Sequence, residues 1–270
     1  MTHPRMPGCL DLQIWAGGMM TCMTTHSARA IEIAGLANIR DLGGLPRTDG
    51  SLTVAGVFYR SENVDQVRSE GWRQLQDAGI RTIIDLRQPA ERAQDSSERP
   101  DWITTVAIDL DGLENEAFWV DYWQTGLVGT ALYFLPHLAA MPERAGGVLA
   151  ALLNARKGGV LFHCMGGRDR TGMIALLLLA AAGVTTEAIV GDYLETVRLA
   201  EARATTSGRS NQEPAIEDFC IERGTTTEGA FRLALAGLNL NEFLDAASFS
   251  QPDRAALATW RGTHRRISPQ

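Results

Sequence analysis

Residues 159–182 impose the strongest constraint on the fold of this chain. Residues 160–163 (Val-Leu-Phe-His) are a short apolar run and predict a buried β-strand. A glycine-rich loop follows, and residues 171–182 then predict a helix that is apolar on every side. Because such a helix must be covered over most of its surface, this strand and this helix belong in the centre of a layered protein.

The elements predicted around this centre alternate between strand and helix, and the chain then becomes helical. Such alternation indicates a parallel sheet. The sequence therefore predicts an α/β fold, with a central, mostly parallel four- to five-stranded sheet flanked by helices and a helical C-terminal part over residues 205–270. The predicted strands are 31–33, 57–60, 80–86, 103–108 and 160–163. The predicted helices are 69–77, 145–156, 171–182 and 185–204, with an amphipathic helix in the aromatic stretch 109–135 and a loop over 205–213.

The length of 270 residues is about the upper size for one hydrophobic core, so we expect residues 29–270 to form a single domain. Residues 1–28 are rich in Met, Thr and Gly and show no clear period. We expect them to be either a disordered N-terminal extension or, in part, a consequence of the alternative start methionines that they contain.

Composition excludes several classes of protein. Asp and Glu number 32 against 25 Lys and Arg, and this net charge of −7 argues against a nucleic-acid partner. No apolar run is long enough to span a membrane, and no signal peptide is visible. The four scattered cysteines do not form a disulfide framework, so we expect a reducing, cytoplasmic location, with secretion without a signal peptide left open. The oligomeric state cannot be inferred from the sequence.

The chemistry is concentrated in residues 163–172 (His-Cys-Met-Gly-Gly-Arg-Asp-Arg-Thr-Gly). A loop between a buried strand and a buried helix presents several backbone N–H groups to one point, and the helix N-terminus adds positive partial charge. Glycines let the backbone curl round an anion without Cβ clashes. We therefore predict a phosphate-binding loop. Its predicted substrate-binding residues are Met165, Gly166, Gly167, Arg168 and Thr171.

Cys164 and Arg170 are the predicted catalytic residues of this loop. The N–H groups, the helix dipole and Arg170 would stabilise a thiolate, and cysteines activated in this way have pKa values of roughly 3.5 to 7.5. Arg170 lies six positions after the cysteine and can grip two phosphate oxygens at once. The Thr171 hydroxyl is expected to donate a hydrogen bond to the cysteine sulfur.

The loop has the pattern His-Cys-x5-Arg-(Ser/Thr)-Gly, which resembles the signature of the Cys-dependent protein tyrosine phosphatases. Its narrower form, His-Cys-x-x-Gly-x-Asp-Arg-Thr-Gly, is similar to that of the bacterial tyrosine phosphatase family that includes atypical dual- and triple-specificity enzymes. Three further blocks match in the family's order: residues 38–44 (Asn-Ile-Arg-Asp-Leu-Gly-Gly), 58–61 (Phe-Tyr-Arg-Ser) and 84–87 (Ile-Asp-Leu-Arg), with Glu91 following.

This resemblance implies a protein tyrosine phosphatase-like fold and hydrolysis of phosphoric monoesters through a cysteinyl-phosphate, without a metal or another cofactor. The implied partners are phosphorylated substrates: proteins carrying phosphotyrosine or phosphoserine/threonine, or phosphoinositides. The family usually has Lys at the position of Arg168. Only Lys157 among the 25 basic residues is a lysine, so a general replacement of lysine by arginine is a sufficient explanation of this departure. The alternative is a changed preference for the head group of the substrate.

Release of the leaving group needs a proton donor. The resemblance makes Asp169 the first candidate, because related enzymes with Lys-Asp-Arg in the loop have been assigned in that way. The alternative for Asp169 is a helix N-terminal carboxylate that pairs with Arg40 or Arg87. Asp109 and Asp111 precede the aromatic stretch and would be the acids of a mobile loop.

His163, Asp85 and Arg40 are expected to support the loop. His163 would orient it by hydrogen bonding, and Asp85 ends a predicted buried strand at the sheet edge where ligands bind in α/β proteins. Asp85 is either a second candidate acid or, more simply, an ion-pair partner of Arg40 or Arg60. The charged residues expected to form one network below the loop are Arg40, Asp41, Arg60 and Arg87.

Two other functions stay open at this point. The first is a catalytically inactive phosphate-binding protein of the same fold, although every residue of the loop chemistry is present. The second is another enzyme with a cysteine loop, such as a sulfurtransferase or an arsenate reductase. The Arg-Thr-Gly entry into an apolar helix and the three additional blocks favour the phosphatase over both.

Overall fold

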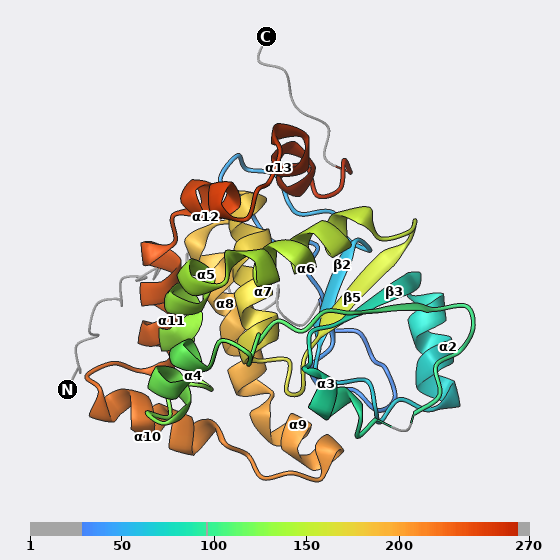
Figure 1. Ribbon diagram of the computed structural model, residues 1–270. Helices are drawn as coiled ribbons and strands as arrows, with labels where there is room; N and C mark the ends of the chain where they lie inside the picture. The colour runs from blue at the N-terminus through green and yellow to red at the C-terminus, as the bar shows by residue number, and fades with distance from the viewer. Residues whose placement is uncertain (1–28, 96, 264–270) are drawn as a thin grey trace, which may run out of the picture.

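The computed structural model describes residues 29–95 and 97–263, and it has the α/β architecture that the sequence predicts (Figure 1). Its five-stranded sheet has the order β1-β2-β5-β3-β4, in which β2, β5, β3 and β4 run parallel and β1 runs antiparallel to β2. The strands are β1 (Arg40–Asp41), β2 (Phe58–Ser61), β3 (Ile80–Asp85), β4 (Thr104–Ala107) and β5 (Gly159–His163).

Helices cover the sheet and make up the C-terminal part (Figure 1). Before β5 they are α2 (Ser69–Asp77), α3 (Pro89–Arg92), α4 (Glu116–Trp123), the 3-10 helix η1 (Ala131–Tyr133), α5 (Phe134–Ala140) and α6 (Pro142–Asn154). After β5 they are α7 (Asp169–Ala181), α8 (Thr186–Arg198), α9 (Ala200–Ser207), α10 (Glu213–Glu222), α11 (Thr227–Gly237), α12 (Leu240–Ala246) and α13 (Gln251–Ala258).

Strand β5 lies in the middle of the sheet and is buried on both faces. Val160 and Phe162 join the larger hydrophobic cluster with α6 and α7, whereas Leu161 joins the smaller cluster beneath α2. Successive side chains of a strand point to opposite faces, so burial on both faces explains why this segment is an uninterrupted apolar run.

Helix α7 confirms the prediction of an all-round buried helix. Nine of its 13 residues are buried, in one run from Thr171 to Leu179. It packs against β2 and β5 on one side and against α6, α8, α12 and α13 on the others. The helix is therefore enclosed by the sheet and by the C-terminal part of the chain, which explains why it carries apolar residues on every side.

The C-terminal helices share the core of the sheet. Tyr193 of α8 stacks on Phe231 of α11 at a ring distance of 4.0 Å, and Trp260 meets Phe58 of β2 edge-on. From this shared core we infer that the described residues form a single domain. The extension expected at residues 1–28, with Cys9 and Cys22, lies outside the described residues.

The structure corrects several predicted elements. The strand expected at 31–33 is reduced to isolated bridges, because the chain turns at Gly35, which has a φ of +93°. The helix expected over 185–204 is divided into α8 and α9, since the backbone leaves the helical conformation at Leu199. Helix α9 then continues into the segment 205–213 that was predicted as a loop. The helix expected in the aromatic stretch 109–135 is present as the short α4, and the 3-10 helix η1 follows it.

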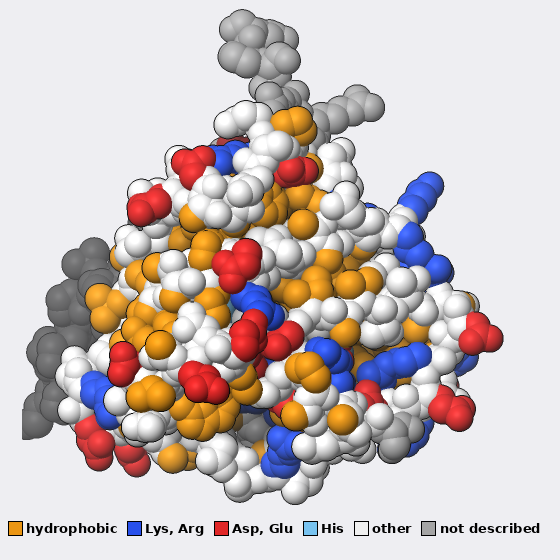
Figure 2. All heavy atoms as spheres, in the orientation of Figure 1, with side chains coloured by type: hydrophobic (Ala, Val, Ile, Leu, Met, Phe, Trp, Pro, Cys, Tyr) orange, Lys and Arg blue, Asp and Glu red, His pale blue; other side chains and the backbone are white. Residues whose placement is uncertain are grey.

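The described surface mixes charge signs. On the face shown in Figure 2, acidic and basic side chains lie next to each other between apolar areas. None of the helices within residues 29–95 and 97–263 combines the length and the apolar character that crossing a membrane requires.

Candidate active site

The predicted phosphate-binding loop connects the end of β5 to the start of α7, at the carboxyl edge of the parallel strands. Ligands bind at this edge in open α/β sheets. Cys164 is the first residue after β5 and is only 3% exposed. The strand, the loop and the buried helix therefore place the thiol at the bottom of the site.

The backbone carbonyl groups of residues 164–167 are all bound by donors outside the turn of the loop. The contacts are His163 Nδ1 to Cys164 O (3.0 Å), Asn63 N and Nδ2 to Met165 O (3.0 and 3.1 Å), Arg203 Nη1 to Gly166 O (3.0 Å) and Arg60 Nη2 to Gly167 O (2.8 Å). In a trans peptide the carbonyl of one residue and the N–H of the next point in opposite directions. Carbonyls held outside therefore direct the N–H groups of residues 165–168 towards the inside of the loop.

Gly167 is required for this conformation. Its φ is +67°, in the left-handed region that favours glycine. A Cβ atom at this position would lie 2.4 Å from the carbonyl oxygen of Ser61, which belongs to β2. The close approach of the loop to β2 therefore leaves no room for a side chain.

Arg170 lies on the first turn of α7 and is held by two carboxylates. Its Nη2 donates to Glu91 Oε1 at 2.7 Å, and its Nη1 donates to Glu91 Oε2 and, at 2.8 Å, to Asp111 Oδ2. Burial raises the pKa of Glu91, but the hydrogen bonds and charge of Arg170 outweigh it, and the pKa lies below its usual value. Glu91 is therefore an anion that fixes the plane of the guanidinium group.

Asp111 differs from Glu91 in the direction of its pKa shift. Burial raises the pKa of Asp111 to about 6, against the charge of Arg170, and the nearby Glu91 adds to the rise. The Trp119 indole N–H of α4 donates to Asp111 O at 3.1 Å and so ties the backbone of this residue to the helix. A carboxyl group that can carry a proton near neutral pH thus contacts Arg170.

Asp169 and Arg168 form an ion pair with each other. Asp169 Oδ1 accepts from Arg168 Nη1 at 2.7 Å, so the expected pairing of Asp169 with Arg40 or Arg87 is wrong. Arg168 also donates to the carbonyl oxygen of Gly129 and, through Nε at 2.8 Å, to Glu213. Nε and Nη1 of Arg168 are thus engaged within the protein, and Nη2 is buried without a partner among the described residues, so a substrate would meet this residue at its backbone N–H.

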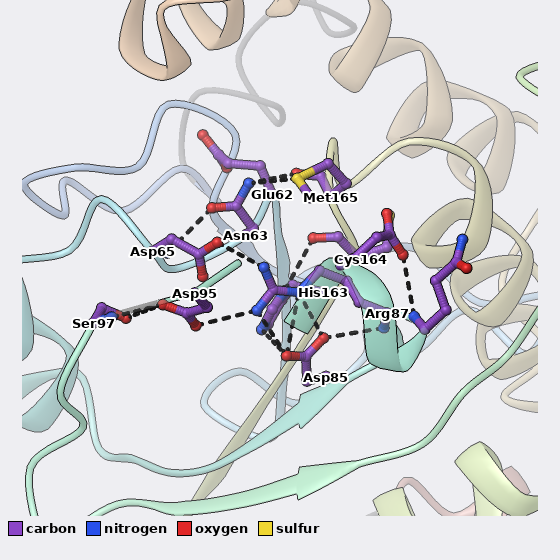
Figure 3. Close-up of polar contacts among 12 residues, drawn as sticks. Glu62, Asn63, Asp65, Asp85, Arg87, Asp95, Ser97, His163, Cys164 and Met165 are labelled. Carbon is purple, nitrogen blue, oxygen red and sulfur yellow. Dashed lines mark hydrogen bonds and ion pairs between the residues drawn. The ribbon is translucent and has the colours of Figure 1, made fainter. Parts of the chain in front are cut away.

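His163 and Asp85 lie beneath the loop with Arg87 (Figure 3). Burial lowers the pKa of His163 to about 4 despite the nearby Asp85, so the imidazole is neutral at physiological pH. Asp85 is paired with Arg87 at 2.9 Å, so the expected Arg40 or Arg60 partner is wrong because those side chains turn to another element. Figure 3 shows Arg87 between the carboxylates of Asp85, Asp65 and Asp95.

Asp192 of α8 is the ion-pair partner of Arg40 and Arg60, and the sequence did not reveal this pairing. Its carboxylate, 0% exposed, accepts from Arg29 (2.9 Å), Arg40 (2.9 Å) and Arg60 (2.7 Å). Burial raises the pKa of Asp192, but the charges of these arginines hold it well below its usual value. The network predicted below the loop is therefore two networks, one around Asp192 and one around Arg87.

Two predicted roles change in the structure. Asp41 is outside both networks and accepts from the backbone N–H groups of Gly43 and Gly56 at 2.7 Å each. The Thr171 hydroxyl is buried and makes no hydrogen bond to any described residue, so the expected bond to the Cys164 sulfur is not formed.

Two cavities border the loop, and both are lined by Asn63 and Met165. The larger, of about 910 Å³, extends over α2 and reaches Glu91. The smaller, of about 260 Å³, lies between the loop and the α9–α10 segment and reaches Asp169. Within the described part of the chain, no cluster of three or more His, Cys, Asp or Glu side chains could hold a metal ion.

Comparison with known proteins identifies the family of this chain. Residues 31–259 match the model of a family described as the tyrosine phosphatase family. The chain is 27% identical over 194 residues to a putative tyrosine-protein phosphatase of Cupriavidus necator, covering 70% of this chain and 71% of the relative. It is 27% identical over 192 residues to the triple specificity protein phosphatase PtpB of Mycobacterium tuberculosis, covering 61% and 68%.

A shorter match joins the chain to a tyrosine-protein phosphatase of Nostoc commune, 32% identical over 143 residues, with 52% of this chain and 48% of the relative covered. Among solved structures, a cysteine-to-serine variant of P. aeruginosa TpbA in complex with pTyr aligns with a TM-score of 0.40 at 14% identity, over 85% of this chain and 100% of that one. Since the family model spans most of the chain, this protein belongs to the tyrosine phosphatase family and is a phosphatase.

Proposed function

We propose that the protein hydrolyses phosphoric monoesters through a cysteinyl-phosphate on Cys164. The observation that carries this proposal is the set of outside donors on the carbonyls of residues 164–167, which leaves the loop N–H groups free to bind an anion above the thiol. Preorganised donors of this kind stabilise transition-state charge without reorganisation during the reaction.

In the first step, the Cys164 thiolate attacks phosphorus, and the bond from phosphorus to the leaving oxygen breaks. Arg170 and the N–H groups of residues 165–168 hold the equatorial oxygens, where the charge of the transferred group is spread. Nη2 of Arg170 binds only Glu91 and keeps its second hydrogen, whereas the second hydrogen of Nη1 is donated to Asp111. Arg170 can therefore donate from Nη2 to the phosphoryl group while Glu91 keeps its orientation. In the second step, water attacks phosphorus and releases the thiolate.

The proton for the leaving group comes, in this proposal, from Asp111. A general acid must be protonated before the reaction, and the pKa of Asp111 is raised to about 6 by burial. Asp169, the candidate from the sequence, is instead paired with Arg168 at 2.7 Å. Asp111 also contacts Arg170, which places it beside the oxygens that Arg170 would bind.

Substrates with different leaving groups distinguish Asp111 from Asp169 as the general acid. Loss of a general acid matters for a poor leaving group, such as the phenol of phosphotyrosine, and little for an activated nitrophenol. We expect Asp111→Asn to reduce kcat for a phosphotyrosine peptide by about 10²–10⁴-fold and for para-nitrophenyl phosphate far less. Asp169→Asn is the matched variant. If it shows the selective loss and Asp111→Asn does not, Asp169 is the acid.

Cys164→Ser tests the covalent step. It removes the thiolate and is expected to abolish turnover while phosphate binding is retained. Full activity in this variant would refute the cysteinyl-phosphate.

For the substrate we propose phosphotyrosine, with phosphoserine, phosphothreonine or phosphoinositides as further substrates. The support is the name of one relative, a triple specificity protein phosphatase. The measurement is kcat/KM for a phosphotyrosine peptide, a phosphoserine peptide and a phosphoinositide, each with Cys164→Ser as the background control. A phosphotyrosine value below both others would contradict this order.

A further inference from the structure

Glu213, the first residue of α10, joins two arginines next to the loop. Its Oε1 accepts from Arg168 Nε at 2.8 Å and from Arg203 Nη2 at 2.9 Å. Arg203 in turn donates from Nη1 to Gly166 O at 3.0 Å. One carboxylate oxygen thus connects a side chain of the loop to the side chain that holds the backbone of the loop.

The three side chains are largely shielded from solvent. Their exposed fractions are 5% for Arg168, 14% for Arg203 and 11% for Glu213. Charge-assisted hydrogen bonds are stronger in such surroundings than in water, and two guanidinium groups on one oxygen would repel each other without it. Glu213 therefore sets the positions of both arginines.

We propose that Glu213 is a positioning residue for catalysis: through Arg203 it fixes the Gly166 carbonyl, and so the N–H group of Gly167, one of those proposed to bind phosphate. This inference rests on the proposed phosphate-binding role of the loop and adds to it a contribution from the C-terminal helices. Glu213 does not touch the substrate in this scheme. Its effect reaches the site through the backbone of the loop.

The test follows alkylation of Cys164 by iodoacetamide, with the modified peptide identified by mass spectrometry, so that no turnover is needed. Two quantities are measured in Glu213→Gln: the pH midpoint of alkylation, and the concentration of inorganic phosphate that halves the rate. Glu222→Gln is the matched control, because Glu222 is an exposed residue of the same helix and loses the same charge.

A positioning role predicts that Glu213→Gln moves the midpoint to higher pH and raises the protecting phosphate concentration at least tenfold, while Glu222→Gln changes neither. A purely electrostatic role predicts the opposite midpoint shift, because losing a nearby negative charge favours the thiolate. A merely structural role lowers the melting temperature and leaves both quantities unchanged. Either of these two results overturns the proposal.

A double-mutant cycle with Arg203→Met tests the route. If Glu213 acts through Arg203, Glu213→Gln has much less effect on phosphate protection in the Arg203→Met background, because the contact to Gly166 is already lost. Equal effects in both backgrounds overturn the route. Lack of hydrolysis by the wild-type protein would refute the proposed function but would leave this result intact, since alkylation and protection do not depend on turnover.

Discussion

Asp192 gives the sharpest prediction about stability. It is a fully buried carboxylate that pairs with Arg29, Arg40 and Arg60. The change Asp192→Asn keeps the size of the side chain, removes its charge and replaces one acceptor oxygen by an NH₂ donor. That donor would face an arginine N–H at about the present 2.7–2.9 Å, and the arginines would be left with uncompensated charge.

Removing one partner of a buried ion pair typically costs about 3–5 kcal/mol, because the other charge stays buried without compensation. Here three partners depend on one carboxylate, so we expect at least this range. For a protein of this size, each kcal/mol shifts the melting temperature by roughly 2–4 °C, which gives a decrease of about 6–20 °C. The assay is urea unfolding at pH 7, followed by tryptophan fluorescence, together with a thermal melt.

Asp77→Asn is the control. Asp77 pairs with Arg73 at 2.8 Å, but its side chain is 64% exposed, and exposed pairs of this spacing contribute about 0.3–0.5 kcal/mol. A loss below 1 kcal/mol in Asp192→Asn, or a loss equal to that of the control, would refute the argument that this buried cluster holds α8 against β1 and β2.

The pH dependence follows from the direction of the shift. The pKa of Asp192 is held low in the folded state, so its contribution to stability is present above the ordinary aspartate pKa of about 3.9 and is lost as the pH falls below it. The difference between wild type and Asp192→Asn should therefore be largest near neutral pH and shrink in acid.

Three further predictions concern the site. Burial raises the pKa of Asp111 to about 6, so ionisation of this residue destabilises the fold as the pH rises from about 4 to 6. In urea unfolding, Asp111→Asn should therefore be about 1–3 kcal/mol more stable than wild type at pH 7.5 and equally stable below pH 4. Gly167→Ala should lower stability by about 2 kcal/mol or more and abolish phosphate protection of Cys164, because the positive φ and the contact with Ser61 O exclude a Cβ. Thr171→Val should keep or raise the free energy of unfolding, by up to about 1 kcal/mol, since the buried hydroxyl has no partner among the described residues; a loss above 1 kcal/mol would show that the hydroxyl is bonded.

The central part of the fold could be predicted because its signals are local. A short run of β-branched and apolar residues bounded by glycine gave β3 and β5, and an apolar helix after a glycine-rich loop gave α7. The misplaced elements are those whose boundaries depend on tertiary contacts. No propensity signal divides α8 from α9 at Leu199, where Ala200 and Ala204 turn into the core.

Only those site residues that lie within one segment of the sequence could be predicted. Cys164, Arg170 and the glycines occur within one segment, and their spacing alone indicates a phosphate-binding loop. Asp192 and Glu213 lie far along the chain from it, on helices, where an acidic residue ordinarily faces solvent. A buried position for Asp192 has one signal in the sequence, since it stands next to Tyr193 in the mostly apolar stretch that begins α8. That signal does not name its partners.

The two halves of the site depend on each other for a physical reason. Backbone N–H groups bind an anion well only if they point at it before it arrives, and a glycine-rich loop has no intrinsic preference for that conformation. The restraint here comes from outside: Arg203, fixed by Glu213, holds the carbonyl of Gly166, and Arg60, fixed by Asp192, holds that of Gly167. This arrangement predicts that the loop motif alone is insufficient for the proposed phosphate site, because its conformation also depends on side chains of helices α8 to α10.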